Sequence, residues 1–259
     1  MNNDQINYDD DLNDYDDPNE YDGPDNHDEP NNHEEHTEIC VADVYKNLVD
    51  NALKNAENGV SKITDHIIRM EGLTGTKTRH FYNNLLDTPD ARYLEIGPGK
   101  GSSVCSAMCN NKATVVCIDN LIELGGVNNE LLSNFNTYKG NNNASFIECD
   151  SFKVDVSTLP KFNIYMYDGD HDEKSHYNAL VHYYKCLDDT FIFVVDDWNW
   201  EHVRKATMES IEFLKLNVLY EKHLITSETP NMTLNSIGGQ QHWWNGMYVV
   251  VLQKNTAIK

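Results

Sequence analysis

Carboxylates that could share a metal ion follow two apolar runs in the second half of the chain. Asp168 comes directly after residues 163–167, and Asp196-Asp197 come directly after residues 191–195. If these runs are neighbouring parallel strands, their carboxyl ends meet at one edge of a sheet. Three such acids would repel one another and their pKa values would rise, unless a cation lies between them. Oxygen ligands suit Mg²⁺, with Mn²⁺ or Ca²⁺ as alternatives, so we predict a metal site at Asp168, Asp196 and Asp197.

The same acids also have a purely structural interpretation. Asp196 or Asp197 could cap a helix that begins near Trp200, while Asp168 could simply end its strand. This interpretation explains one acid of the pair and leaves the other without a role. The pattern therefore favours the metal site.

A glycine-rich turn follows an earlier apolar run and indicates a bound cofactor. Glu95, Gly97, Gly99 and Gly101 have the spacing E-x-G-x-G-x-G. The dinucleotide fingerprint G-x-G-x-x-G would need a third glycine at position 102, where the chain has Ser102. The turn alone predicts a cofactor with a nucleoside above this strand, and Ser102 counts against a nicotinamide dinucleotide.

Acidic and polar residues also follow the next two apolar runs. Asp119-Asn120 come after residues 114–118, where a carboxylate can accept both ribose hydroxyls, and Asp150-Ser151 come after residues 145–149, where they can meet an adenine edge. Each acid could instead be a helix N-cap. Because the pattern recurs after successive strands, we interpret these residues as a nucleoside site.

The elements that must position these residues alternate between strand and helix. Helical spacing predicts helices at 41–57, 61–70, 77–86, 102–110, 121–133, 174–187 and 200–215. Short apolar runs predict strands at 92–97, 114–118, 145–149, 162–167 and 191–195, with a closing pair at 216–226 and 247–252. This alternation predicts an α/β fold with a parallel sheet covered on both faces and an antiparallel pair at its edge.

The acidity of the chain is concentrated at its start. The 259 residues carry a net charge of −22, yet residues 1–38 hold 15 of the 42 acidic residues and none of the 20 lysines and arginines. This segment has almost no aliphatic residues, so we expect a disordered acidic tail. Such acidity makes nucleic acid an unlikely partner.

Cysteine usage and hydropathy suggest where the protein works. The six cysteines form no C-x-x-C pair, no secretory segment opens the chain, and the longest apolar run, residues 247–252, is too short to cross a membrane. We therefore expect a soluble cytoplasmic protein with no membrane partner. The sequence leaves a homo-oligomer open.

The glycine turn and the acids that follow resemble class I S-adenosylmethionine (SAM) methyltransferases. The resemblance implies a Rossmann-like, seven-stranded, mostly parallel sheet with an antiparallel final strand and helices on both faces. It implies three parts: the tail 1–38, an N-terminal helical cap 39–90 and a SAM-binding domain 91–259. The residues expected to bind the cofactor are Glu95, Gly97, Gly99, Gly101, Ser102, Asp119, Asn120, Asp150, Ser151 and Asp168.

The later acids resemble those of cation-dependent O-methyltransferases of the catechol and caffeoyl-CoA type, and of their relatives acting on sugars and macrolides. In these families, acids at the places of Asp168, Asp196 and Asp197 hold the divalent ion. The catechol type has a lysine base where this chain has His171, and an asparagine in place of Asp197. Both departures favour a sugar or macrolide acceptor. His171 suits a general base because an unperturbed histidine is largely neutral at physiological pH.

The sequence thus predicts a SAM-dependent O-methyltransferase, assisted by Mg²⁺, which methylates a hydroxyl of a small molecule or sugar. Three alternatives stay open at this point. They are a metal-independent N- or O-methyltransferase, a non-catalytic SAM-binding relative, and a nucleotide-dependent oxidoreductase.

Overall fold

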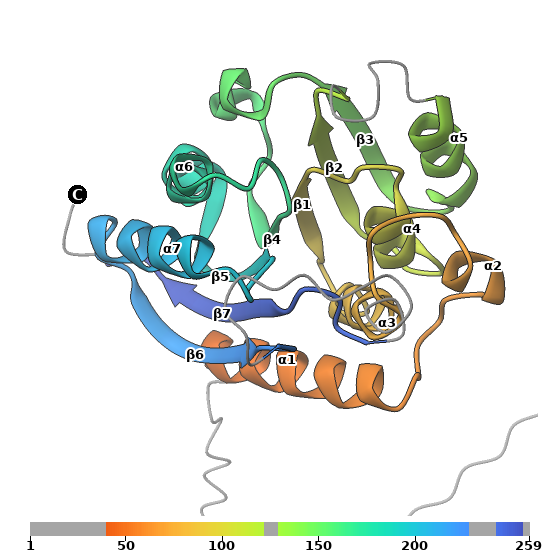
Figure 1. Ribbon diagram of the computed structural model, residues 1–259, viewed down its shortest axis with the longest axis horizontal. Coiled ribbons are helices and arrows are strands. Elements are labelled where there is room, and N and C mark those ends of the chain that lie inside the picture. The colour runs from red at the N-terminus through yellow and green to blue at the C-terminus, as the bar shows by residue number, and fades with distance from the viewer. Residues whose placement is uncertain (1–39, 122–128, 228–241, 256–259) are drawn as a thin grey trace, which may run out of the picture. The chain divides into compact units, whose positions relative to one another are not determined.

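The computed structural model describes residues 40–121, 129–227 and 242–255 (Figure 1). The expected acidic tail, residues 1–38, lies outside the described residues, as do residues 122–128 of one expected helix. Among the described residues, no helix is both long enough and apolar enough to cross a membrane.

A seven-stranded sheet forms the centre of the fold, with the strand order β3-β2-β1-β4-β5-β7-β6. Its strands are β1 (Arg92–Ile96), β2 (Thr114–Asp119), β3 (Asn143–Glu148), β4 (Phe162–Tyr167), β5 (Leu187–Asp196), β6 (Asn217–Leu224) and β7 (Met247–Gln253). Strands β1 to β5 pair in parallel, whereas β7 runs antiparallel to both β5 and β6. This confirms the predicted Rossmann-like sheet with its antiparallel final strand.

The strand order reverses between β1 and β4. The chain proceeds outward from β1 through β2 to β3, then returns to the other side of β1 and continues through β4 to β5. Connections on the two sides of such a reversal leave in opposite directions, and a crevice opens at the carboxyl ends of the strands. The topology therefore places a ligand site above β1 and β4.

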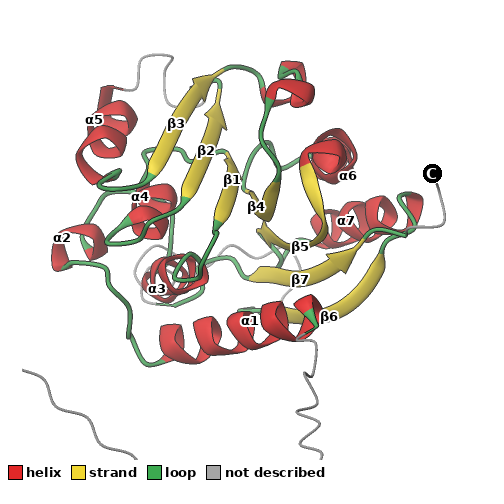
Figure 2. Ribbon diagram, turned by 180° about the vertical axis from the view of Figure 1, so that it is seen from behind, coloured by secondary structure: helices red, strands yellow, loops and turns green. Residues whose placement is uncertain are grey.

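Helices cover both faces of the sheet (Figures 1 and 2). They are α1 (Val41–Glu57), α2 (Asp65–Ile68), α3 (Thr76–Leu85), α4 (Ser102–Met108), α5 (Asn129–Tyr138), α6 (Glu173–Tyr183) and α7 (Glu201–Phe213). Apolar residues of α1 to α5 pack against one face, and those of α6 and α7 pack against the other. The central strands are buried on both faces, which explains their continuous apolar sequence.

The segment before β1 is tied to α4 through buried polar contacts. Asn83 of α3 is fully buried, and its side-chain amide donates to the carbonyl oxygens of Ser106 and Cys109, both at 2.8 Å. Its side-chain oxygen accepts from the backbone N–H of Lys62 at 2.8 Å. These bonds fix α3 against the end of α4, so the loop between α2 and α3 lies next to the glycine turn.

The bounds of several elements differ from the sequence prediction, most clearly those of β5 and α2. Strand β5 begins at Leu187, four residues before the predicted strand, although Asp188 and Asp189 are typical of a loop. Asp188 is accommodated because it accepts two hydrogen bonds from the Arg92 guanidinium, at 2.7 and 3.1 Å. Helix α2 is only four residues long and begins at Asp65 rather than at residue 61, because the side chain of Thr64 caps it by accepting from the Ile67 N–H.

Candidate active site

The glycine turn of β1 lies in direct contact with the end of β4. Gly97 has a φ of +81°, and a Cβ added to it would lie 1.9 Å from the carbonyl oxygen of Asp168. The backbone N–H of Asp168 also donates to the carbonyl oxygen of Ile96, at 3.0 Å. Only glycine permits this close approach of two backbones. The contact places the glycine turn and the acids after β4 around one space.

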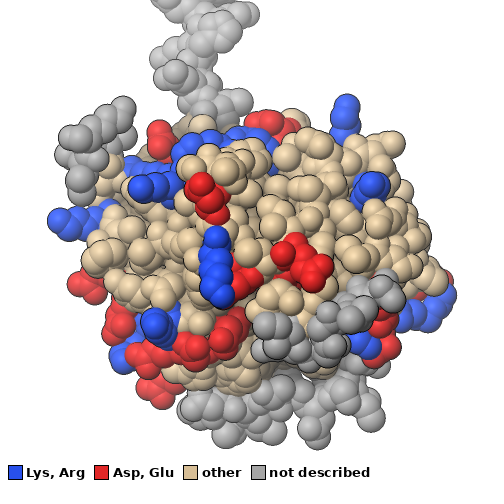
Figure 3. Space-filling view, turned by 90° about the horizontal axis from the view of Figure 1, so that it is seen from above, with Lys and Arg blue, Asp and Glu red and all other residues tan. Residues whose placement is uncertain are grey.

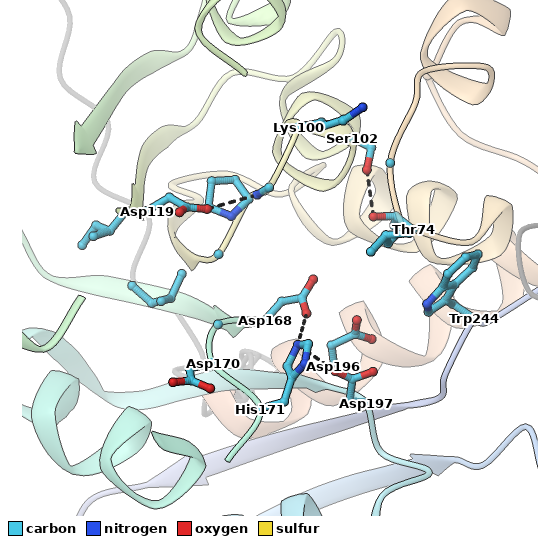
Figure 4. Close-up of a pocket in the computed structure, with 18 of the residues that line it drawn as sticks. Thr74, Lys100, Ser102, Asp119, Asp168, Asp170, His171, Asp196, Asp197 and Trp244 are labelled. Carbon is cyan, nitrogen blue, oxygen red and sulfur yellow. Dashed lines mark hydrogen bonds and ion pairs between the residues drawn. The ribbon is translucent and has the colours of Figure 1, made fainter. Parts of the chain in front are cut away.

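That space is a cavity of about 1150 Å³ above the carboxyl ends of the strands (Figure 4). It exceeds the roughly 300–1,000 Å³ typical of a single small-molecule site, so it has room for two reactants. Most of the site residues predicted from the sequence line it, namely Gly97, Gly99, Ser102, Asp119, Asn120, Asp150, Ser151, Asp168, His171, Asp196 and Asp197. Glu95 and Gly101 are not among the lining residues.

Glu95 is completely buried behind the glycine turn. Its carboxylate accepts hydrogen bonds from the Tyr93 hydroxyl, at 2.8 Å, and from the Ser103 hydroxyl. Burial raises the pKa of Glu95 to about 7, although both hydrogen bonds lower it. In this structure the side chain supports the turn from below, and its carboxylate oxygens are already bonded.

The acids after β2 and β3 also have local partners. Asp119 accepts from the backbone N–H groups of Leu121, at 2.7 Å, and Gly99, at 3.3 Å. Asp150 accepts from the Phe152 N–H at 3.0 Å and pairs with Lys153 at 3.1 Å, and these contacts lower its pKa. Asp150 therefore acts as the N-cap considered above while it also lines the cavity.

A different arrangement stands at the ends of β4 and β5. The Nε2 atom of His171 lies 3.0 Å from Oδ2 of Asp197 and 3.9 Å from Oδ1 of Asp168. One ligand atom from each of these three residues lies within 4.8 Å of the others. Asp196 lies beside them in Figure 4. The structure thus brings together the three predicted metal ligands and the predicted base.

The carboxylates of this group repel one another. Burial, and then repulsion from neighbouring acids, raises the pKa of both Asp168 and Asp196 well above the ordinary value. For Asp168 the main repelling neighbour is Asp197, and for Asp196 it is Asp168.

Asp197 is held in an unusual conformation. Its backbone has a φ of +56°, in the left-handed region, and its Oδ1 accepts from the Asn245 side chain at 2.6 Å. Left-handed backbone at a non-glycine residue is uncommon and is maintained only by its surroundings. The surrounding structure therefore holds Asp197 in a strained backbone conformation, and in this conformation its carboxylate contacts His171.

These residues fit a divalent cation. Carboxylate oxygens are suitable donors for Mg²⁺ or Mn²⁺, and a cation would relieve the repulsion that raises the pKa values of Asp168 and Asp196. His171 contacts Asp197 directly, so its ring would be within reach of a cation held by that carboxylate.

Several lining residues were not singled out as site residues by the sequence. Thr74 donates to or accepts from Ser102 at 2.9 Å, Lys100 pairs with Glu71, and Arg79 is buried in the wall. For Arg79 a signal was present: the positions three and four residues away on its helix, 75, 76, 82 and 83, carry no acid. An arginine without an acid at these positions, on a helix that packs into the core, was a hint of a special role.

The four tryptophans have different positions. Trp198 and Trp243 are buried, and their indole N–H groups donate to His223 at 2.9 Å and to Glu57 at 2.6 Å. Trp200 stands edge-on to His171, with ring centroids 5.2 Å apart. Trp244 is the tryptophan that lines the cavity.

No protein-family model matches this chain, and neither does any curated protein. Among solved structures, it is similar to an O-methyltransferase from Bacillus cereus in complex with SAH, with 11% identity, a TM-score of 0.49, and coverage of 80% of this chain and 91% of the other. It is also similar to TrmN from Thermus thermophilus, with 13% identity, a TM-score of 0.48, and coverage of 73% and 52%. A third is the precorrin-6y C5,15-methyltransferase from Geobacter metallireducens GS-15, with 14% identity, a TM-score of 0.45, and coverage of 68% and 86%.

This chain therefore spans about half the length of TrmN, and also about half that of another matched structure complexed with SAH. With TM-scores below 0.5 and such low identities, these likenesses assign no activity to this chain. The functional argument rests on the site itself.

Proposed function

We propose that this protein is a SAM-dependent O-methyltransferase that acts, with the help of a divalent cation such as Mg²⁺, on a hydroxyl of a small molecule or sugar. The observation that carries the proposal is the shared cavity. It joins the glycine turn of β1 with the group of Asp168, His171, Asp196 and Asp197 at the ends of β4 and β5. One side can hold a methyl donor while the other activates an oxygen.

The residues divide the chemical work between the two sides. When bound, SAM supplies an electrophilic methyl group and the cation supplies positive charge beside the acceptor oxygen. Asp168, Asp196 and Asp197 would hold the cation, and Nε2 of His171 would take the proton of the acceptor hydroxyl. The walls would align the oxygen with the methyl group, and alignment is a large part of catalysis in a displacement without a covalent enzyme intermediate.

The charge of the cavity favours an uncharged acceptor. In the space-filling view from above, several acidic side chains lie near the centre of this face, with a basic side chain among them (Figure 3). The lining includes the acids Asp119, Asp150 and Asp170 besides the metal group. A polyanion such as nucleic acid would be repelled, whereas a sugar could stack on the partly exposed Trp244 in the cavity wall.

The experiment that tests the proposal is a SAM turnover screen of sugars, catechols and macrolide glycosides, each with Mg²⁺ and with EDTA. We expect turnover with at least one hydroxylated acceptor, and its loss in EDTA. Asp168→Asn should lower turnover by about 100-fold or more, because the cation loses a ligand whose charge it needs.

The matched control is Asp170→Asn, which makes the same chemical change two residues away in the same loop. Asp170 lines the cavity but is exposed and lies outside the metal group, so turnover should stay within a few-fold of wild type. Full activity in EDTA would remove the cation from the proposal. Absence of SAM binding by calorimetry would remove the methyltransferase itself.

His171 can be assigned by separating metal binding from turnover. If it is the base, His171→Ala abolishes turnover while Mn²⁺ and SAM still bind with nearly unchanged affinity. If it is a ligand, as its 3.0 Å distance to Asp197 also allows, the Mn²⁺ affinity falls together with turnover.

A further inference from the structure

Arg79 is a buried cation in the wall of the cavity. Its side chain projects from α3, only 3% of the residue is exposed, and burial lowers its pKa to about 10. Its Nε donates to the carbonyl oxygen of Thr74, and its Nη1 donates to those of Ile67, Ile68 and Met70, at distances of 2.7 to 3.2 Å. Within the described residues, Nη2 is the guanidinium nitrogen that has no hydrogen-bond partner.

The positive charge of Arg79 is also unbalanced. A second arginine and a lysine also line the cavity, and both have acidic partners: Arg69 lies 3.8 Å from Asp65, and Lys100 pairs with Glu71. Arg79 pairs with no carboxylate of the described residues, and its bonded partners are neutral carbonyl groups. A buried charge without a counter-ion is costly, and it is retained where a ligand completes the pair.

The surroundings of Nη2 form a site for a small anion. Nη2 lies 3.8 Å from the point where a Cβ of Gly72 would stand, and that point is only 2.1 Å from the Ser102 hydroxyl oxygen. Ser102 in turn is bonded to the Thr74 hydroxyl, and all four residues line the cavity beside the glycine turn. The absence of a side chain at Gly72 keeps the space between the guanidinium and the two hydroxyls open.

We infer that Arg79, with the hydroxyls of Ser102 and Thr74, binds the α-carboxylate of the amino-acid part of the methyl donor. This inference rests on the proposed function and deepens it. A carboxylate is a planar anion with four lone-pair sites, so it can accept from Nη2 and from a hydroxyl at once. It would supply the negative charge that Arg79 lacks. The opposite end of the donor then extends toward Asp119 and Asp150, while its sulfur stays near the glycine turn.

The test compares the binding of S-adenosylhomocysteine (SAH), which has the carboxylate, with that of its carboxamide, which has the same size without the charge. Calorimetry on the full chain should show that wild type prefers SAH by roughly 10- to 100-fold, the range of a charge-assisted hydrogen bond. In Arg79→Gln this preference should disappear, because the SAH affinity falls to that of the carboxamide. The matched control Arg69→Gln should keep the preference, because Arg69 is exposed and already paired.

Three results would overturn the inference. Wild type could bind SAH and the carboxamide with equal affinity. Alternatively, Arg79→Gln could lower the affinity for both ligands equally and keep the preference, which would show that Arg79 only stabilises the loop. If wild type binds neither ligand, the proposed function fails as well, so the two failures are distinguishable.

A crystal structure of wild type with SAH keeps the inference testable even if Arg79→Gln does not fold. We expect a carboxylate oxygen within about 3.2 Å of Nη2. A carboxylate that faces Lys100 or bulk solvent would contradict the assignment.

Discussion

The acids at the ends of β2 and β3 and those at the ends of β4 and β5 line the same cavity in opposite states. Asp119 and Asp150 accept hydrogen bonds from nearby backbone N–H groups, and Asp150 has a lowered pKa. Asp168 and Asp196 have strongly raised pKa values. The same residue type at equivalent places in the sheet is stabilised on one side and destabilised on the other.

This difference distinguishes acids whose hydrogen bonds stabilise the fold from acids that need a ligand to balance their charge. A carboxylate that is satisfied by its own loop can shape a site and still contact a neutral hydroxyl. A buried carboxylate that is repelled by its neighbours lowers the stability of the protein until a cation binds. Stability measurements can therefore separate the two sides without any knowledge of the acceptor.

The largest effect is expected between the two sides, where the glycine turn after β1 contacts the end of β4. Gly97→Ala places a Cβ against the carbonyl oxygen of Asp168 and gives a side chain to a left-handed backbone, so the loops after β1 and β4 must separate. We expect a loss of about 3 kcal/mol or more in the free energy of unfolding, measured by urea denaturation. Gly99→Ala is a useful control, because a Cβ there meets no atom within 4 Å although its φ is also positive, at +54°. Equal losses in both variants would show that the close contact is unimportant.

A second prediction concerns Glu95, a buried acid that lies outside the proposed metal group. Its folded pKa of about 7 lies above the ordinary value of 4.5, so the folded state binds the proton more tightly than the unfolded state. The stabilising contribution is complete below about pH 4.5 and is lost as the pH rises to about 7, by about 3 kcal/mol. The unfolding free energy of wild type should therefore fall relative to that of Glu95→Gln over this range. Parallel pH profiles would show that Glu95 keeps an ordinary pKa.

The third prediction inverts the usual effect of removing a buried charge. Asp196→Asn should raise the stability of the metal-free protein by about 1–3 kcal/mol, because it removes repulsion with Asp168 and Asp197. Saturating Mg²⁺ or Mn²⁺ should stabilise wild type more than the variant, with a gain of about 2.7 kcal/mol at a concentration 100 times the Kd. Thermal unfolding with EDTA and with added metal measures both. A variant less stable than wild type in EDTA would contradict the assignment of this side.

The smallest effects belong to the satisfied side. Asp119→Asn should lower the unfolding free energy by about 1 kcal/mol, because charged acceptors of the Gly99 and Leu121 N–H groups become neutral. Asp150→Asn should cost less than about 1 kcal/mol, since this residue is partly exposed and its pair with Lys153 is screened by solvent. If either variant were stabilising, the contrast between the two sides would be lost.

Much of the fold was predictable from hydrophobic periodicity. Residues 162–167 form β4 as expected, and the closing antiparallel pair was recognised from its apolar runs. The start of β5 does not follow from the local pattern, because Asp188 and Asp189 are typical of a loop, and the long-range pairing of Asp188 with Arg92 is what accommodates this acid in the strand.

The positions of the candidate site residues were also largely predictable from the sequence. Residues directly after parallel strands must meet at one edge of the sheet, and the proximity of Asp168, Asp196 and Asp197 followed from that rule. Side-chain direction did not follow from it. Glu95 is turned inward to Tyr93 and Ser103, and His171 lies between two of the acids.

The sequence by itself determined which strands form and which polar residues stand at their ends, because both depend on local pattern and on the parallel direction of neighbouring strands. Only the tertiary structure decided which of those acids remain unsatisfied and that Arg79 pairs with no carboxylate among the residues that the structure describes. Charge balance inside a protein depends on burial and on partners far apart in the chain, such as Arg79 beside Gly72 and Ser102. These quantities exist only once the elements have packed.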